Sequence, residues 1–399
     1  MSAIENSFSR HIAWTSDQPL GLIIDRAVGP HIYLQDGRRV IDFISGIAVS
    51  SLGHSHPRVV EAAKRQIERY THVMVYGEVI QEPQVALATL LAGHLPAALQ
   101  VIYYTNSGTE ANEGALKLAK KYTGRSRMIA FEASYHGDTH GALSVTGRDI
   151  YRNPFQPLLP DVEFLPFDDV DALRAIDRET ACVITEPIQG EGGINVPSKR
   201  WLQSLRARCS EAEALLIFDE VQTGCGRTGS LFAFQQFDVV PDILTVAKSF
   251  GGGFPLGGFV SSPEIFRTFR SDPPLSHVTT FGGHPVSCAA AHAALSELLE
   301  HDLPSRSLDI EARIRDRLRH PLIAEIRGRG AMLGLRMRDD NTTARVVARC
   351  LERGVLLGWT LHSHRLIRIA PPLNIEWNVV DEACAVIREA MDAVGEHSK

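Results

Sequence analysis

Two ionisable side chains stand at the ends of apolar runs in the middle of the chain. Lys248 follows residues 243–247 and precedes a glycine-rich stretch, and Asp219 follows residues 215–218. Because short runs of β-branched and apolar residues predict buried strands, both side chains are expected where a strand ends and a loop begins. Each has an ordinary interpretation, a solvated lysine and an aspartate paired with an arginine. Together they are also what pyridoxal phosphate (PLP) requires, since a lysine can form a Schiff base with its aldehyde and a carboxylate can pair with its pyridine nitrogen.

A turn rich in small polar residues lies between a predicted strand at 101–104 and a predicted helix from 115. It contains Ser107, Gly108 and Thr109. The unpaired N–H groups and the dipole of a helix start attract anions, and hydroxyl groups add donors. The turn therefore predicts a phosphate site, although an ordinary helix N-cap has the same composition.

An aromatic residue and an amide follow two other predicted strands. Tyr135 and His136 come after the run 128–131, and Gln222 lies three residues beyond Asp219. An aromatic ring at a strand end can stack on a flat ligand, or it can lie in a surface turn. Gln222 is expected close to Asp219.

A glycine-rich loop with two carboxylates follows the apolar run 181–184. Glu186 and Glu191 lie in this loop. The two acids could orient a cofactor, pair with a cation that gates the substrate, or be solvated.

Two other patterns are not predicted to be functional sites. Residues 224–229 match G-x-G-x-x-G, but they do not directly follow a strand and no clear helix follows them, so a dinucleotide site is not predicted. His54, His56, His362 and His364 lie in predicted loops without cysteines or acids at ligand spacing, so no metal site is predicted.

The composition is that of a soluble globular protein and excludes several classes. The 399 residues carry a net charge of −6, so the overall charge does not indicate a nucleic-acid-binding protein. No apolar stretch is long enough to span a membrane, and the first residues do not form a secretory signal. The six cysteines are scattered without a C-x-x-C pair, which argues against a disulfide framework and predicts a cytoplasmic location.

The alternation of patterns predicts an α/β fold. From about 57 to 300, apolar runs alternate with helical patterns, which predicts a large domain with a mostly parallel sheet covered by helices. Residues 301–399 contain predicted helices at 309–319 and 380–394 with strands between them. With the short strands of residues 1–56, they are expected to form a smaller α+β domain.

The motifs together resemble those of class III aminotransferases of the fold-type I PLP family. That group includes acetylornithine, ornithine and 4-aminobutyrate aminotransferases. The resemblance runs from about Asp42 to Leu373 in the family's order, through N-S-G-T-E-A-N, E-P-I-Q-G-E-G-G, F-D-E-V-Q-T-G-x-G-R-T-G, K-S-F-G-G-G-F-P-L-G-G and T-T-F-G-G-H-P. One departure is His284, where the acetylornithine and ornithine branches usually have asparagine.

The resemblance implies how the chain would hold PLP. Lys248 resembles the Schiff-base lysine that also moves the substrate proton, and Asp219 resembles the partner of the pyridine nitrogen. Thr280 resembles a threonine that reaches the phosphate bound by a neighbouring subunit, which implies a homodimer with shared active sites. The resemblance implies other cofactor contacts as well. Ser107, Gly108 and Thr109 would bind the phosphate group, and Tyr135, with its neighbour His136, would stack on the ring. Glu186 would be a supporting carboxylate, and Gln222 would lie at the phenolic oxygen.

The resemblance also implies the substrate contacts and the reaction. Arg368 resembles the arginine that grips a substrate carboxylate, and Glu191 resembles the acid that pairs with it when an ω-amine donor is bound. Tyr76 is expected at the entrance. The implied reaction is ping-pong transfer from an ω-amino donor, such as N-acetylornithine, ornithine or 4-aminobutyrate, to 2-oxoglutarate. The alternatives are a PLP-dependent aminomutase or decarboxylase, and a catalytically degenerate binding protein.

Overall fold

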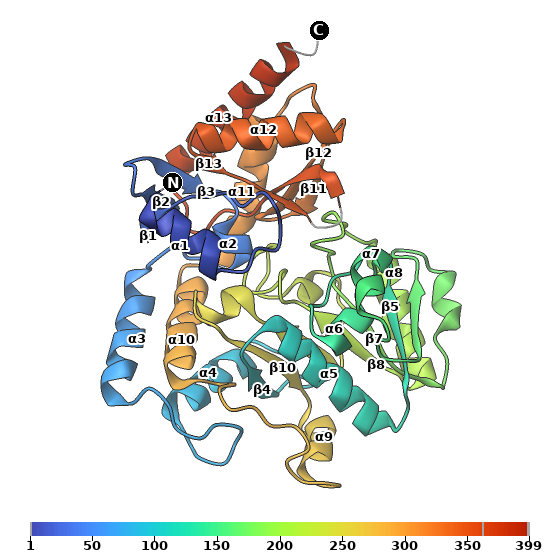
Figure 1. Ribbon diagram of the computed structural model, residues 1–399. Helices are drawn as coiled ribbons and strands as arrows, with labels where there is room; N and C mark the ends of the chain where they lie inside the picture. Colours follow the sequence, from blue (N-terminus) through green and yellow to red (C-terminus); the bar gives the residue numbers. More distant parts are fainter. Residues whose placement is uncertain (1, 361–362, 397–399) are drawn as a thin grey trace.

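The computed structural model describes residues 2–360 and 363–396, and its largest element is a seven-stranded sheet (Figure 1). The strand order is β4-β10-β9-β8-β7-β5-β6. Every neighbouring pair is parallel except the two pairs that β10 makes with β4 and β9. The predicted mostly parallel sheet is therefore confirmed. Its strands are β4 (Val101–Thr105), β5 (Arg127–Phe131), β6 (Val162–Leu165), β7 (Thr180–Thr185), β8 (Leu215–Asp219), β9 (Ile243–Val246) and β10 (Gly257–Ser261).

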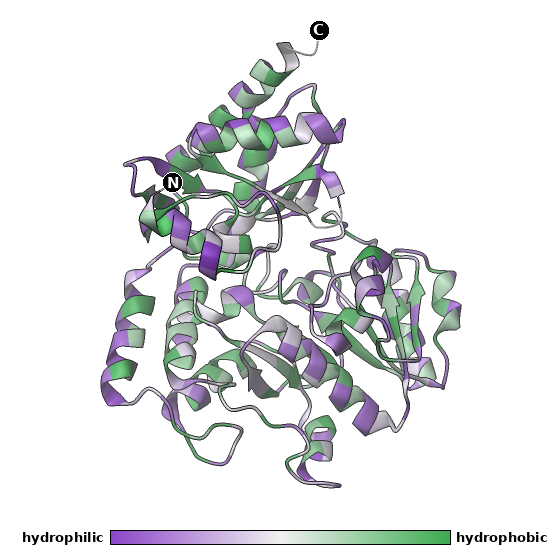
Figure 2. Cartoon of the chain, viewed as in Figure 1, coloured by the Kyte–Doolittle hydropathy of each residue, from purple (hydrophilic) through white to green (hydrophobic). Residues whose placement is uncertain are grey.

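Helices cover both faces of this sheet, and the strands are mainly hydrophobic (Figure 2). Strand β7 illustrates why the strands are hydrophobic. Val183 packs in one buried cluster, and its neighbours Cys182 and Ile184 pack in a second buried cluster. A strand buried on both faces needs an almost continuous apolar sequence, which is the pattern that made it predictable. The helices are α3 (Pro57–Arg69), α4 (Glu82–Ala92), α5 (Gly108–Thr123), α6 (His140–Ser144), α7 (Asp149–Arg152), α8 (Lys199–Ala212), α9 (Pro263–Phe266) and α10 (Pro285–Glu300).

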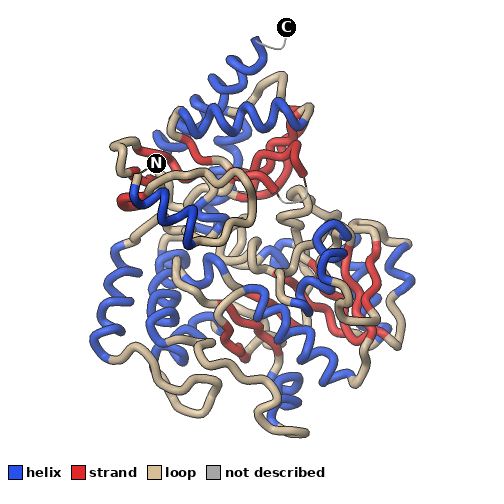
Figure 3. Tube along the Cα trace, in the orientation of Figure 1, coloured by secondary structure: helices blue, strands red, loops and turns tan. Residues whose placement is uncertain are grey.

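The two ends of the chain fold together beside the large sheet (Figures 1 and 3). Strand β3 pairs in parallel with β13, with Ile41 opposite Val355. A second small sheet is antiparallel, in the order β11-β12-β15-β14. The predicted smaller α+β unit from both termini is confirmed, while the domain boundaries at residues 56 and 300 stay a prediction. Its elements are α1 (Ala3–His11), β1 (Ile24–Val28), β2 (His31–Leu34), β3 (Arg39–Asp42), α2 (Ser45–Ala48), α11 (Leu303–Arg317), β11 (Ile323–Arg329), β12 (Met332–Met337), α12 (Asp340–Glu352), β13 (Val355–Leu356), β14 (Gly358–Thr360), β15 (Ser363–Ile369) and α13 (Trp377–Glu396).

Some predicted boundaries were wrong. The helix predicted at 309–319 begins at Leu303, because Pro304 occupies the first turn, where a missing N–H costs nothing. The helix predicted at 380–394 extends from Trp377 to Glu396. His362 lies outside the described residues. Among the described helices, none is long and apolar enough to cross a membrane.

The glycine pattern at 224–229 forms turns, and its arginine joins the two domains. Arg227 is fully buried and donates to the hydroxyl of Ser51 at 2.8 Å and to the carbonyl oxygens of Ala331 and Pro371. Ser51 in turn lies 2.7 Å from the hydroxyl of Ser249. Arg227 therefore connects both terminal segments to the turn that carries Lys248.

Candidate active site

A cavity of about 470 Å³ opens at the edge of the large sheet where its parallel strands end. Strands β4, β5, β7, β8 and β9 each place polar residues there, because the carboxyl ends of parallel strands meet at one edge. The structure thereby brings together most of the site residues that were predicted from sequence. Those that line the cavity are Ser107, Gly108, Thr109, Tyr135, His136, Glu186, Asp219, Gln222 and Lys248.

Lys248 begins a 3₁₀ turn directly after β9 and has a left-handed backbone, with φ +48°. This conformation is uncommon for a residue other than glycine, and such backbone strain concentrates at functional sites. Burial lowers the pKa of the Lys248 amine, and Arg368 lowers it further, while Glu191, Asp219 and Glu186 oppose them. The amine is therefore neutral at lower pH than that of an ordinary lysine, which favours its action as a nucleophile and as a proton acceptor.

Asp219 is buried at the end of β8 and is fixed by three donors. Its Oδ2 accepts from Nδ2 of Asn112 at 2.7 Å and from Nδ1 of His136 at 2.8 Å. Its Oδ1 accepts from the backbone N–H of Val221 at 3.0 Å. The hydroxyl of Thr245 holds Asn112 in place through a 2.8 Å bond to its Oδ1. The carboxylate is thus oriented from three elements, ready for a cationic partner.

Asn112 and Thr245 were missed by the sequence prediction. Asn112 lies on the buried side of α5 between Ala111 and Ala115, where a polar side chain is exceptional. That single polar residue on an apolar helix face is the signal that would have pointed to it. Thr245 carried no comparable signal, because threonine is common in strands.

The start of α5 is suited to an anion. Ser107 is the N-cap, and its hydroxyl accepts from the N–H of Glu110 at 3.3 Å. The N–H groups of the first turn have no partners within the helix, so those of Gly108 and Thr109 remain for a ligand. Gly137 faces this turn, and a Cβ there would lie 2.3 Å from Oγ1 of Thr109, so only glycine fits.

Glu186 supports the loops that line the cavity. Its carboxylate accepts from the N–H of Tyr135 at 3.2 Å and from the N–H of Gly190 at 2.9 Å. Burial raises the pKa of Glu186 to about 7, against the opposing effect of His136. The main contribution of Glu186 is therefore to hold the backbones of Tyr135 and Gly190 in place, and its negative charge is secondary.

Arg368 of β15 and Glu191 form a buried ion pair beside the cavity. Their side chains are only 6% and 7% exposed. Glu191 also accepts from Nε2 of Gln222 at 3.4 Å, which links the pair to the cavity. Glu191 compensates the charge of the buried Arg368 guanidinium, and a substrate carboxylate could take its place. Nε of Arg368 and Oε1 of Gln222 are buried without a hydrogen-bond partner among the described residues.

Two predicted residues, and the one departure from the motifs, lie apart from this cavity. Thr280 is exposed, and Tyr76 is half-buried with its hydroxyl 3.0 Å from Sδ of Met74. His284 stacks on His72 with ring centroids 5.8 Å apart, immediately before α10, and does not line the cavity.

The fold and the site define the class first: the chain has the fold of the fold-type I transaminases. It superposes on an ornithine aminotransferase from Toxoplasma gondii with a TM-score of 0.92 at 32% identity, covering 99% of this chain and 95% of that one. It also superposes on a transaminase from the marine bacterium Virgibacillus with a TM-score of 0.93 at 26% identity, over 100% of both chains.

The sequence comparisons define the family. The aminotransferase class-III family matches residues 12–391. An acetylornithine aminotransferase from Methanopyrus kandleri is 44% identical over 92% of this chain and 93% of its own length, and one from Bacillus subtilis is 37% identical over 98% of both. The chain belongs to the class III aminotransferase family and is a transaminase, which favours amino-group transfer over the aminomutase, decarboxylase and degenerate alternatives.

Proposed function

We propose that this enzyme transfers an amino group from an ω-amino donor, N-acetylornithine or a close analogue, to 2-oxoglutarate by a ping-pong mechanism with PLP. The observation that carries the proposal is the buried Arg368–Glu191 pair beside the cavity of Lys248. It gives one pocket a carboxylate-binding guanidinium that can be neutralised when no carboxylate is present. The names of the M. kandleri and B. subtilis relatives support N-acetylornithine among the possible donors.

The cavity residues fit PLP group by group. The amine of Lys248 suits an aldehyde, the first turn of α5 suits a phosphate, and the Asp219 carboxylate suits a protonated pyridine nitrogen. The unpartnered Oε1 of Gln222 is available to accept a hydrogen bond from a ligand. A volume of about 470 Å³ is within the range of small-molecule sites.

The side chains of the chain divide the work of the reaction. When bound, PLP supplies an electron sink for the bond broken at the amine-bearing carbon. Asp219 keeps a proton on the pyridine nitrogen, and Asn112 and His136 hold that carboxylate in position. Lys248 would accept the proton from the amine-bearing carbon of the donor and pass it to the cofactor carbon that carried the aldehyde, which its lowered pKa allows. Arg368 binds the carboxylate beside the reacting carbonyl of 2-oxoglutarate bidentately after Glu191 turns away, because an ω-amine donor has no carboxylate at that position.

The proposal includes a homodimer with shared sites. Thr280 is exposed on its own chain, next to the exposed Phe281 and two residues from the exposed Val278. Ile80, near Tyr76, is 95% exposed, which is costly for a large apolar side chain unless another surface covers it. A second copy of the chain would cover these loops and bring Thr280 and Tyr76 to its cavity. A cytoplasmic location belongs to the same proposal and is supported by six free, buried cysteines.

The donor assignment is tested by product formation. The purified protein, supplied with PLP and 2-oxoglutarate, is given N-acetylornithine, ornithine, 4-aminobutyrate or an α-amino acid, and glutamate is measured. We expect the highest kcat/KM with N-acetylornithine. Equal or greater kcat/KM with an α-amino acid would contradict the ω-donor proposal.

Replacing Arg368 with alanine is expected to raise the KM for 2-oxoglutarate by about 100-fold, because a charge-assisted bidentate contact is lost. Arg368→Lys is expected to recover little, since an ammonium cannot reproduce the planar fork. Steady-state kinetics with varied 2-oxoglutarate measure the effect, and Arg336→Ala, at a half-buried arginine, serves as a control. An unchanged KM would show that the acceptor binds elsewhere.

Replacing Glu191 with glutamine is expected to move the acidic limb of the pH profile for the donor reaction to lower pH. Glu191 is the first of the charges that raise the pKa of Lys248, so its removal lowers that pKa further. A lower pKa keeps the amine neutral into more acidic solution. Donor kcat/KM is measured across the neutral range, and movement of the limb to higher pH would contradict the assignment.

A further inference from the structure

Two arginines occupy one row of the antiparallel sheet in the smaller domain. Arg327 of β11 is opposite Gly334 of β12, and Gly334 is opposite Arg368 of β15. Directly opposed residues share a face of a sheet, so both guanidinium side chains leave the same face with only a glycine between them. At a strand spacing of about 4.8 Å, the two backbones are about 10 Å apart.

Both arginines bind one loop of the large domain, residues 189–195, which we call the Glu191 loop. Arg368 pairs with Glu191 in its middle, and Nη1 of Arg327 donates to Oδ1 of Asn195 at 3.0 Å. Asn195 closes the loop: its backbone exchanges two hydrogen bonds with Gln189, at 3.0 and 3.1 Å. Its side-chain amide also donates to Oε1 of Gln189 at 2.8 Å and to the carbonyl of Gly192 at 3.2 Å.

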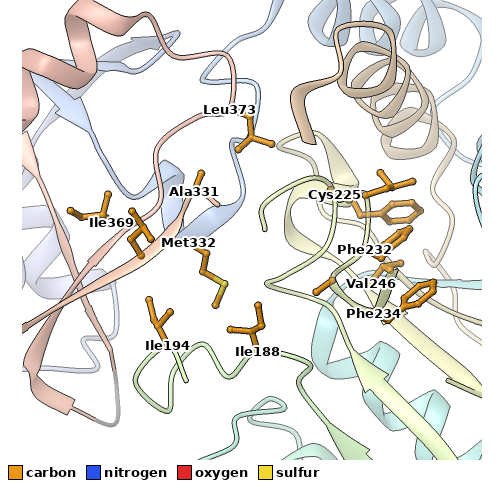
Figure 4. Close-up of a cluster of buried hydrophobic side chains, with 14 of the residues drawn as sticks. Ile188, Ile194, Cys225, Phe232, Phe234, Val246, Ala331, Met332, Ile369 and Leu373 are labelled. Carbon is orange, nitrogen blue, oxygen red and sulfur yellow. The ribbon is translucent and has the colours of Figure 1, made fainter. Parts of the chain in front are cut away.

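The Glu191 loop depends on the smaller domain for its shape. Ile194 has φ +54°, a left-handed conformation that is a genuine outlier for a β-branched residue. Its side chain is fully buried, and Figure 4 shows Ile194, together with Ile188 just before the loop, pointing toward Met332 of β12. Strained backbone persists only where its surroundings over-determine it, and here part of those surroundings belongs to the sheet that carries both arginines.

We propose that Arg327, acting through Asn195, is a positioning residue that holds Glu191 at Arg368 and so supports the donor half-reaction selectively. The inference rests on the proposed function. With an ω-amine donor, Glu191 neutralises Arg368, so the geometry of the Glu191 loop matters. With 2-oxoglutarate, the acceptor carboxylate replaces Glu191 at Arg368, so the position of Glu191 no longer matters.

The test separates the two half-reactions of the PLP-loaded enzyme. In single-turnover experiments, Arg327→Met is expected to lower donor kcat/KM about tenfold, the scale of one charge-assisted hydrogen bond, with acceptor kcat/KM within about twofold of the unsubstituted enzyme. Arg327→Lys should recover part of the donor rate, and Asn195→Ala should reproduce the loss. The Kd of glutarate, a dicarboxylate that cannot react, should be unchanged or lower in Arg327→Met, because Glu191 competes less for Arg368.

Arg336 offers a matched control. It lies in β12 and binds Oε2 of Glu325 at 3.0 Å, the same oxygen that Nε of Arg327 binds at 2.8 Å, but it does not contact Asn195. Arg336→Met should leave both half-reactions unchanged. An equal loss in both half-reactions of Arg327→Met, or no loss in either, would overturn the inference while leaving the proposed function intact. Failure of the unsubstituted enzyme to react with any ω-amine donor would overturn the proposed function and the inference with it.

Discussion

Replacement of Lys248 with alanine is expected to lower kcat by about four orders of magnitude, the upper range for loss of a positioned acid–base group. The same substitution removes the amine that would link the cofactor, so the visible absorbance of the bound cofactor should shift as well. The physical reason is local: Lys248 is the lysine that lines the cavity, and its lowered pKa suits it to accept a proton.

Two comparisons make the Lys248 result specific. Lys199, an exposed lysine paired with Asp238, provides a control, and Lys199→Ala should retain full activity. Addition of a small primary amine to Lys248→Ala should restore part of the proton transfer if the side chain acts as a base. Multiple turnovers of Lys248→Ala at the unsubstituted rate would show that another group does this work.

Replacement of Asp219 with asparagine is expected to lower kcat by about two to three orders of magnitude, as for loss of a preorganised electrostatic contact. Asparagine has nearly the same shape but no charge, so it cannot hold a proton on the pyridine nitrogen. An amide also has only one acceptor oxygen. If that oxygen takes the place of Oδ2 and accepts from Asn112 and His136, the NH2 group faces the N–H of Val221, which is itself a donor.

The Asp219 effect is separated from loss of cofactor by measuring bound phosphate and absorbance in the same preparation. Asp238→Asn, an exposed change of the same chemistry, is the control. If Asp219→Asn retained its cofactor and full kcat, the proposed electrostatic role of Asp219 would be wrong.

The sequence predicted where the site residues lie along the chain better than it predicted which side chains contact one another. Lys248 and Asp219 could be placed at strand ends because strands buried on both faces have continuous apolar sequences that stop where polar loops begin. Local patterns do not show which side chains meet across elements. The bond from His136 to Asp219 spans 83 residues, and the pair of Arg368 with Glu191 spans 177 residues.

The smaller domain was the harder part to predict in detail. Its helices were predicted too short, and the pairing of β3 with β13 depends on contacts between the chain's two ends that no local periodicity encodes. The row that aligns Arg327 with Arg368 is set by two strand registers, and a one-residue slip in either would send a side chain to the opposite face. The role of the buried Arg227 was not predicted, because its motif indicates neither its burial nor its partners Ser51, Ala331 and Pro371.

The most direct test of the central claim is a visible absorbance titration of the purified, PLP-loaded protein. Addition of N-acetylornithine alone should bleach the absorbance of the lysine-bound cofactor, and addition of 2-oxoglutarate should then restore it, because the two half-reactions are separate. Absorbance that no ω-amine donor changes would contradict the proposed transfer, even if the protein retained its cofactor.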